Sequence, residues 1–582
     1  MLRATAAGAG GKRRFSASDW LFGLAMLCAI ACHVPAVFAP LTIDDFAQRA
    51  MTHGGYPPGD RGPFSLYDFV DDTNRQELVD RGIFPWWTHP RMVARFLRPL
   101  SSLSLYLDYR IGPDTALWGH AENLLWWAAA SATVYVLAAR LFDRRVARIA
   151  CFAFAACPCH AIPLIWVANR ETFISQVLGI AGLLGYVAWR RRGRVRDGAL
   201  SLALFALAMA AGEYSFCFAG YIAAFELVGT RDRLRRRVLG VLPFAIPAAG
   251  YLLVRAAFHY GARASGLYFD PFWDFASFIR GAIERFTVLL CTGWLGASVQ
   301  PLVPPSTLVI AITLAIATPL IAAAIVHTFR AMSPSFRLDA AWILLGSVLS
   351  IFPVLAVVVS YRILGVPMIG ISMIVALVIS EAWFPARPPE QRGLGELVSL
   401  VAVGLAFIHL VLSSYRGFTA MQAIVSVNAT MNRRVEWVRD HAKGKSEIVV
   451  LRAETLGGLL PWMLCDLPLQ WRALSFEAGH VLVLRTGEQS LELVAGPSPL
   501  FRMGAGQIFR PYGSPLHVGD SIRVRGMTVT VVELEQDGAA RRARFDFDRN
   551  LDDPSILWIK ETAGGFEERP LPRIGQGEPL TP

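Results

Sequence analysis

The sequence WLFGLAMLCAIACHVPAVF at residues 20–38, followed by TIDDFAQRA at residues 42–50, decides how the rest of the chain is organised. At a rise of about 1.5 Å per residue, the first stretch is long enough to cross the hydrocarbon core of a membrane as a helix. Basic residues precede it, and such residues stay on the cytoplasmic side. The pattern therefore predicts a cytoplasmic tail at residues 1–19 and puts Asp44 and Asp45 at the outer mouth of the first span.

The composition is typical of a polytopic membrane protein. Of the 582 residues, 54% are hydrophobic and only 17% are charged, and the mean hydropathy is +0.42. The net charge of +11 would suit nucleic-acid binding, but the basic residues cluster between apolar segments, as in cytoplasmic loops. We therefore expect membrane lipid, and not nucleic acid, as a partner. Only Cys465 of the eight cysteines lies in the hydrophilic tail, so no disulfide framework is expected there.

Ten further apolar stretches raise the expected number of transmembrane helices within residues 20–415 to about eleven. They lie at residues 118–139, 148–167, 173–189, 199–212, 214–229, 239–257, 307–327, 340–359, 364–383 and 395–414. The run from Ala199 to Gly229 is interpreted as two spans with an apex at Gly212 and Glu213, because arginine clusters flank it on both sides. Residues 286–299 are apolar but too short to cross, which favours an interfacial or re-entrant helix.

This topology places every basic loop on one side of the membrane and the C-terminus on the other. The basic loops are residues 140–148, 190–196, 231–237, 328–337 and 386–392. We expect a multi-pass protein of the cytoplasmic (inner) membrane with its C-terminal domain outside, in the periplasm. The first outer loop, at about residues 40–116, is too long for a simple connection and is expected to fold on the membrane surface.

The chain changes character from about Asn432. Alternating runs such as HVLVLRT, SIRVRGMTVTVVELEQ and RARFDFD, separated by Gly, Pro and Asp turns, predict an antiparallel sheet. Residues 432–574 are therefore expected to form a small β-rich soluble domain outside the membrane, followed by a disordered tail at residues 575–582.

Ionisable and polar side chains gather near the outer ends of the predicted spans. They are Asp44, Asp45, Arg98, His120, Asn123, His160, Arg170, Glu213, Arg255 and Arg362. Charges near membrane depth are costly and usually face a cavity. Carboxylates can act as a base or hold a cation, and arginine forks match phosphate oxygens. Structural interpretations stand beside these: backbone-bonded interfacial histidines, arginines that anchor the chain at the membrane surface, and a helix cap at Glu213.

Several motifs occur in an order that resembles the membrane glycosyltransferases of the C superfamily. They are TIDDFAQRA, FLRPLSSLSLYLDY, the H-x-x-N of HAENLLWW, CPCHAIPLIWVANRETF, the AGEYS apex and YRILGVPMIG. The resemblance covers roughly residues 20–385 and is greatest to the branch of the protein O-mannosyltransferases and the tetratricopeptide-bearing transmembrane mannosyltransferases. It implies inverting transfer of a sugar from a polyprenyl-phosphate donor to a hydroxyl of a protein, lipid or glycan acceptor, at the outer face of the membrane.

The resemblance also implies roles for individual residues. Asp44 matches the acidic base and Asp45 its neighbour. Arg98, His120, Asn123, His160 and Glu213 match polar positions expected to bind substrate. We expect Arg362, with Arg170 or Arg255, to balance the negative charge of the donor phosphate. No cofactor is certain, although Asp44 and Asp45 could hold a divalent cation. The chain departs from the pattern at Gly212, Trp127 and Thr172, where a lysine, a second histidine and an acidic residue are common, and a β domain replaces the tetratricopeptide array.

Two other functions are compatible with the sequence. A transporter or flippase of a lipid-linked substrate would show an internal repeat and helices broken near the bilayer midplane, and no repeat is found in the sequence. A membrane-anchored assembly or binding protein would need far fewer spans.

Overall fold

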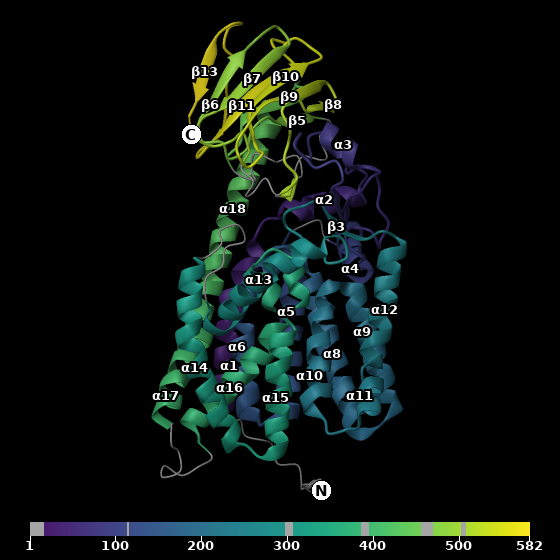
Figure 1. Cartoon of the computed structure of the whole chain (residues 1–582), viewed down its shortest axis with the longest axis vertical. Helices are drawn as coiled ribbons and strands as arrows, with labels where there is room; N and C mark the ends of the chain where they lie inside the picture. Colours follow the sequence, from purple (N-terminus) through teal and green to yellow (C-terminus); the bar gives the residue numbers. More distant parts are fainter. Residues whose placement is uncertain are drawn as a thin grey trace.

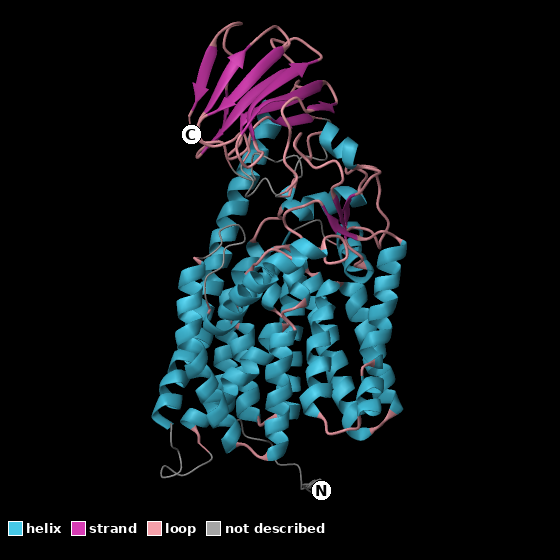
Figure 2. Cartoon of the chain, viewed as in Figure 1, coloured by secondary structure: helices cyan, strands magenta, loops and turns pink. Residues whose placement is uncertain are grey.

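The computed structural model describes residues 17–112, 116–296, 306–385, 395–454, 469–501, 508–511 and 513–581. Its helices stand side by side in a bundle, and a β-rich domain sits at one end of that bundle (Figure 1). Most of the strands lie in this domain, whereas the bundle is built of helices (Figure 2). Cys465 and the predicted basic loop at residues 386–392 lie outside the described residues.

The bundle begins with a helix that continues into a short 3₁₀ turn and includes short irregular turns between its longer helices. Its elements are α1 (Ala17–His33), η1 (Val34–Phe38), α5 (Ala116–Leu141), α6 (Arg144–Ala155), η2 (Pro158–His160), α7 (Ala161–Ile165), η3 (Val167–Asn169), α8 (Glu171–Arg192), α9 (Val195–Ala211), η4 (Glu213–Cys217), α10 (Phe218–Ala224), η5 (Phe225–Gly229), α11 (Leu234–Gly240), α12 (Leu242–Ala257), α13 (Phe275–Leu295), α14 (Thr307–Ala331), α15 (Pro334–Leu349), η6 (Pro353–Ala356), η7 (Tyr361–Leu364), α16 (Pro367–Trp383), α17 (Gly395–Ala406), η9 (Phe407–Leu412) and α18 (Ser413–His441).

Six helices of the described chain are long and apolar enough to cross a membrane. They are Trp20–Phe38, Ala116–Leu141, Val167–Arg192, Leu308–Ala331, Pro334–Ala356 and Gly395–His441. Two bent pairs, Arg144–Ala155 with Pro158–Ile165 and Leu234–Gly240 with Leu242–Ala257, raise the number to eight if each pair is one span. The expected count of about eleven is therefore not confirmed. The other three predicted stretches correspond to α9, to α10 with η5, and to α16, which lie within the bundle (Figure 1) but are shorter.

The interpretation of residues 199–229 as two limbs agrees with the structure. The chain leaves α8 through Gly193, whose φ of +70° is a conformation that favours glycine, and enters α9. Helix α9 then ends at Ala211, and η4 begins at Glu213 after a break at Gly212. The apex therefore falls where the two flanking arginine clusters predict it.

Several basic loops gather at the end of the bundle away from the β-rich domain. Arg190 forms ion pairs with Glu226 at 2.6 Å and with Asp232 at 2.9 Å, and Arg191 pairs with Asp339. These contacts join the loops after α8 and η5 to the start of α15. Figure 1 shows the arginine-rich α11 at the same end. The shared face is what retention of basic loops on one side of a membrane requires.

Helix α13 differs from the predicted short apolar segment. It covers Phe275–Leu295, so it begins well before residue 286 and ends before Gly296. Its first half carries Arg280, Glu284 and Arg285. Because these charges interrupt the apolar pattern, hydropathy predicts only the second half of the helix. Figure 1 shows α13 at the end of the bundle nearest the β-rich domain.

The segment between the first two spans, residues 39–112, folds into short helices and strands and is called the first loop below. Its elements are α2 (Ile43–Thr52), β1 (Asp68–Val70), α3 (Arg75–Asp80), β2 (Val93–Arg95) and α4 (Pro99–Arg110). Strand β3 (Gly261–Arg263), which follows α12, completes an antiparallel sheet in the order β1-β2-β3. This small sheet ties the first loop to the connection between α12 and α13.

The β-rich domain contains a six-stranded and a four-stranded sheet. Its strands are β4 (Glu447–Arg452), β5 (Gln470–Ala473), β6 (Val481–Arg485), β7 (Ser490–Ala495), β8 (Ser521–Val524), β9 (Met527–Leu534), β10 (Ala540–Phe547), β11 (Ile556–Thr562), β12 (Gly565–Glu568) and β13 (Gly577–Leu580). The six-stranded sheet, in the order β13-β6-β7-β10-β9-β8, is antiparallel as predicted. The other, β12-β11-β4-β5, is mixed, because β4 runs parallel to β5 and β11. Strand β4 is buried at every position, as is usual for strands in parallel pairs.

Both ends of the β-rich domain differ from the prediction. Helix α18 continues to His441, so the domain begins near residue 447 and not at 432. The helical segment Gly395–His441 has 47 residues. At about 1.5 Å per residue it is longer than a membrane span needs, and α18 carries the domain out of the bundle (Figure 1). The tail predicted as disordered forms β13, which pairs with β6 and buries Leu580.

The first loop and the β-rich domain share one hydrophobic core. Trp87 of the first loop stacks on Phe501, with ring centroids 4.8 Å apart and an interplanar angle of 6°. The indole Nε1 of Trp86 donates to the carbonyl of Leu474 at 3.1 Å. The two parts therefore form a single folded layer over the end of the helix bundle.

Candidate active site

A cavity of about 330 Å³ lies where the first loop, the helix ends and the β-rich domain meet. Its charged and amide-bearing residues are Asp44, Arg98, Asn169, Glu213 and Arg362. Most of the remaining wall is aromatic or aliphatic and includes Tyr67, Phe96, Trp166, Tyr214, Tyr268 and Phe509. Four residues predicted for a site, Asp44, Arg98, Glu213 and Arg362, are thus brought together.

The start of α2 separates the roles of the two adjacent aspartates. Thr42 precedes the helix and forms a capping box with Asp45, whose Oδ2 accepts from the backbone N–H of Thr42 at 2.8 Å and from its hydroxyl at 2.9 Å. The other oxygen of Asp45 accepts from the backbone N–H of Ala168 at 2.7 Å. Asp44 lies about 100° around the helix from Asp45, lines the cavity, and accepts no hydrogen bond from the described residues.

Both aspartates hold their protons more tightly than usual. Burial raises the pKa of Asp44 to about 7, with a further increase from the charge of Asp45, while Arg362 opposes the shift. Burial raises the pKa of Asp45 to about 6, against the hydrogen bonds from Thr42 and Ala168. Asp44 is half-buried because one side faces the cavity, whereas Asp45 is fully buried.

Arg98 lies on the cavity wall with its charge already balanced. Its Nε donates to Glu213 at 2.7 Å and its guanidinium to Glu171 at 3.1 Å. The guanidinium also stacks over the rings of Tyr67 and Phe96, at 4.9 and 4.6 Å from their centroids. These contacts fix Arg98 between two carboxylates and leave it little positive charge to offer an anion.

Unlike Arg98, Arg362 lies on the cavity wall without a carboxylate partner among the described residues. It comes from η7 and lies 5.5 Å over the ring of Trp166. Within the described part of the chain it forms no ion pair, and its charge opposes the rise in the pKa of Asp44. Arg362 is therefore the cavity arginine whose positive charge is available to a bound anion.

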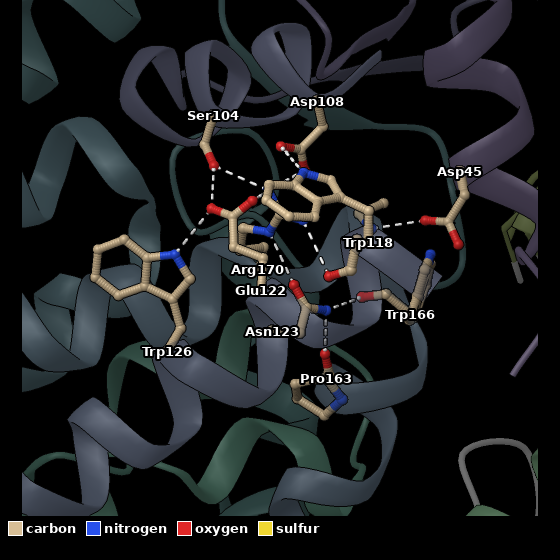
Figure 3. A network of polar contacts seen from close by, with 12 residues as sticks. Asp45, Ser104, Asp108, Trp118, Glu122, Asn123, Trp126, Pro163, Trp166 and Arg170 are labelled. Carbon is tan, nitrogen blue, oxygen red and sulfur yellow. Dashed lines mark hydrogen bonds and ion pairs between the residues drawn. The ribbon is translucent and has the colours of Figure 1, made fainter. Parts of the chain in front are cut away.

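Arg170, predicted to bind the donor phosphate, does not line the cavity. It is fully buried and donates to Asn123 at 2.8 Å, Asp108 at 2.5 Å and Glu122 at 2.8 Å. Figure 3 shows these partners around its guanidinium. The network joins α4, α5 and α8, so the geometry favours a structural role for Arg170 over contact with a substrate.

The other predicted residues also lie outside the cavity wall. The ring of His120 bonds the carbonyl of Leu164 and that of His160 bonds the carbonyl of Phe154, at 3.1 and 2.9 Å. The amide of Asn123 donates to the carbonyl of Pro163 at 2.9 Å, and Arg255 is paired with Asp270. Backbone-bonded histidines are the structural interpretation weighed from the sequence.

Sequence reasoning missed four residues at the site. An acidic residue sought at Thr172 is present one position earlier, at Glu171, where it meets Arg98. Asn169 lines the cavity but was not predicted, although it lies in the sequence between the predicted residues His160 and Arg170. Ile508 and Phe509 of the β-rich domain line the cavity. No local sequence pattern predicts a contact between residues so far apart in the chain.

A divalent cation would find few protein ligands near Asp44. Among the described residues, no three or more His, Cys, Asp or Glu side chains gather as a metal site. Both oxygens of Asp45 are engaged by hydrogen bonds, so the pair does not present two free carboxylates. The residues present do not fit a cation held by both aspartates.

Comparisons with known proteins find similar solved structures but no related sequence. No protein-family model and no curated protein matches the sequence. The chain is similar to ArnT from Cupriavidus metallidurans in the apo state, with a TM-score of 0.42, 14% identity, and coverage of 78% of this chain and 86% of that one. It is also similar to the Archaeoglobus fulgidus oligosaccharyltransferase in the apo form, with a TM-score of 0.39, 14% identity, and coverage of 69% and 56%.

A third similar structure is AglB from Archaeoglobus fulgidus in complex with an inhibitory peptide and a dolichol-phosphate, with a TM-score of 0.38, 12% identity and coverage of 69% and 56%. The chain thus spans little more than half the length of the oligosaccharyltransferases it matches. The mannosyltransferase branch that the sequence resembles is not confirmed by these matches. Because the TM-scores lie below 0.5, the likeness carries no conclusion about activity.

Proposed function

We propose that the protein is a membrane glycosyltransferase that moves a sugar from a polyprenyl-phosphate donor to an acceptor hydroxyl. One observation carries the proposal. Asp44 and Arg362 face the same cavity, and among the described residues neither has an ion pair, whereas the other charges of the cavity wall are paired. A free carboxylate and a free guanidinium are what a base and a phosphate site need.

The reaction is a single displacement. The Asp44 carboxylate takes the proton of the acceptor hydroxyl as its oxygen attacks the anomeric carbon of the sugar. The bond from that carbon to the phosphate oxygen breaks, and the lipid phosphate leaves with the electron pair. Arg362 meets the negative charge that develops on the phosphate. Attack opposite the leaving group inverts the anomeric configuration.

The environment of Asp44 suits this role. A general base works best when its pKa lies near the operating pH, and burial raises the pKa of Asp44 to about 7. Asp45, bonded to Thr42 and to Ala168, fixes the start of α2 and so orients its neighbour. Arg98 is paired with both Glu171 and Glu213, and the three side chains form a fixed charged frame beside the base.

The proposed orientation follows from the basic loops. We place the face with α11 and the arginines after α8 in the cytoplasm, by the preference of basic loops for that side. The cavity and the β-rich domain then lie outside the inner membrane. The acceptor is a hydroxyl of a protein, lipid or glycan that reaches this face.

The test is transfer by the full chain in lipid nanodiscs from a panel of polyprenyl-phosphate hexoses to a membrane extract. Nuclear magnetic resonance of the product reports the anomeric configuration. We expect transfer with inversion. Retention of configuration would exclude the single displacement. If the donors bind and are moved across a liposome membrane without sugar transfer, the protein is a transporter and the enzyme hypothesis is rejected.

A further inference from the structure

The η3 turn is held rigidly beside the cavity. The backbone N–H of Ala168 donates to Asp45 at 2.7 Å, and the carbonyl of Ala168 accepts from the hydroxyl of Tyr67 at 2.7 Å. The amide of Asn123 donates to the carbonyl of Trp166 at 3.3 Å. Hydrogen bonds from three separate parts of the chain therefore fix the backbone of this turn.

Asn169 at the end of this turn has one unused polar atom. The residue is 4% exposed and lines the cavity. Its Nδ2 donates to Glu171 at 2.7 Å, and a carboxylate that is itself held by Arg98 fixes which end of the amide faces it. The Oδ1 atom has no hydrogen-bond partner among the described residues. A buried acceptor without a partner is unfavourable until a donor reaches it.

A hydrogen-bond donor without a partner in the described chain lies just before the same turn. The indole Nε1 of Trp166 is also buried and without a partner in the described chain. The guanidinium of Arg362 lies over the Trp166 ring, 5.5 Å from its centroid. Asn169, with its unused acceptor, and Trp166, with its unused donor, thus line the same cavity as the arginine assigned to the donor phosphate.

We propose that Asn169 Oδ1 accepts a hydrogen bond from a hydroxyl of the sugar attached to the donor phosphate, so that Asn169 determines which sugars are used. An amide oxygen can only accept a hydrogen bond, and a sugar hydroxyl can donate one to it. The sugar is the source of the hydroxyl because it is covalently bound to the phosphate that Arg362 meets. The inference rests on the proposed function.

The test compares polyprenyl-phosphate hexoses with their 2-, 3-, 4- and 6-deoxy analogues, using the full chain in nanodiscs. We expect one deoxy analogue to lose about 10- to 100-fold in kcat/KM with the wild type, because it leaves the buried acceptor unpaired. In Asn169→Leu, and in the smaller Asn169→Ala, the kcat/KM of that deoxy analogue should become about equal to that of its parent sugar. The relative kcat/KM values of the other analogues should not change.

Asn428→Leu is the matched control, since Asn428 is a buried asparagine of α18 outside the cavity wall. It should keep the wild-type discrimination. A wild type that treats all the deoxy analogues like their parents, or a discrimination unchanged in both Asn169 variants, would overturn the proposal. Loss of discrimination among deoxy acceptors instead of deoxy donors would overturn it too, by assigning Asn169 to the acceptor.

Equilibrium binding of the same polyprenyl-phosphate hexoses and deoxy analogues, measured by calorimetry without an acceptor, separates this proposal from the proposed function. Selective binding that depends on Asn169 without any sugar transfer would reject the enzyme and keep the hydroxyl contact. Transfer without selective binding or selective kinetics would reject the contact and keep the enzyme.

Discussion

Adjacent aspartates at the start of a helix look equivalent in a sequence but not in this fold. The capping box turns Asp45 back toward Thr42, and the contact to Ala168 uses its second oxygen. Asp44 is left facing the cavity. The sequence alone predicts the pair and its place after the first span, and capping-box chemistry could have assigned the structural member.

The pH dependence of transfer should report Asp44. A base must be unprotonated, and the pKa of Asp44 is raised to about 7, chiefly by burial. Below that pH we expect kcat/KM to rise about tenfold per pH unit, and above it to level off. Because the charge of Arg362 lowers this pKa, Arg362→Gln should move the midpoint to higher pH.

The control for this profile is Arg433→Gln on the exposed side of α18, which should keep the wild-type midpoint. A profile that is flat from pH 5 to pH 9, or a midpoint that falls in Arg362→Gln, would contradict the assignment of Asp44.

Arg170 and Arg362 should respond differently to removal of the guanidinium. Arg170→Ala leaves the carboxylates of Asp108 and Glu122 without their buried partner, which typically costs about 3 to 5 kcal/mol in the free energy of unfolding. We expect a large drop in melting temperature. Arg362→Ala, which breaks no ion pair of the described chain, should keep the melting temperature and lose donor affinity and rate together.

Differential scanning fluorimetry and donor binding in detergent measure both quantities. The opposite pattern, a stable Arg170→Ala protein that no longer binds donor, would return Arg170 to the phosphate site.

At the scale of elements, the wall of the cavity depends on the layer that the first loop and the β-rich domain build together. Phe509 lines the cavity, and its carbonyl accepts from the backbone N–H of His89 in the first loop at 2.7 Å. Arg510 donates to the carbonyl of Trp87 at 2.8 Å. The β-rich domain is therefore expected to matter for transfer and not only for attachment of a partner.

Trp87→Ala tests this layer. Trp87 is fully buried and stacks on Phe501, and loss of such a side chain typically costs about 3 to 5 kcal/mol in stability. We expect faster proteolysis between α18 and β4 together with reduced transfer. Trp273→Ala is the control, because Trp273 is 51% exposed and should change neither. Unchanged proteolysis and transfer in Trp87→Ala would mean that the layer does not support the cavity.

Across the whole molecule, the sequence predicted features that follow from hydropathy and local charge. The apolar stretches, the apex after Ala211 and the shared face of several basic loops are of this kind. Features that depend on distant packing were missed. Strand β13 contains a glycine and a proline, which are rare in strands, and it is ordered by pairing with β6. Charged residues in the first half of α13 interrupt the apolar pattern, so the full length of that helix was not predicted.

The same limit applies to the site. Hydropathy places a residue on one side of the membrane but does not say which way its side chain points or what it meets. Asp44, Arg98, Glu213 and Arg362 point into one cavity, whereas the predicted Arg170 and His160 are held within the protein. The contribution of Phe509 needs the fold of a domain more than a hundred residues away in the sequence from Arg362.

One comparison decides whether Asp44 is the base that this fold presents to the substrate. Asp44→Asn keeps the size of the side chain and removes its proton affinity, so donor binding should stay near the wild-type value while transfer falls about 10²- to 10⁴-fold. Asp45→Asn should cost less, because Asp45 only orients its neighbour. Sugar transfer from a polyprenyl-phosphate hexose in nanodiscs, with donor binding measured separately, gives both numbers. Transfer by Asp44→Asn at the wild-type rate would show that the proton goes elsewhere.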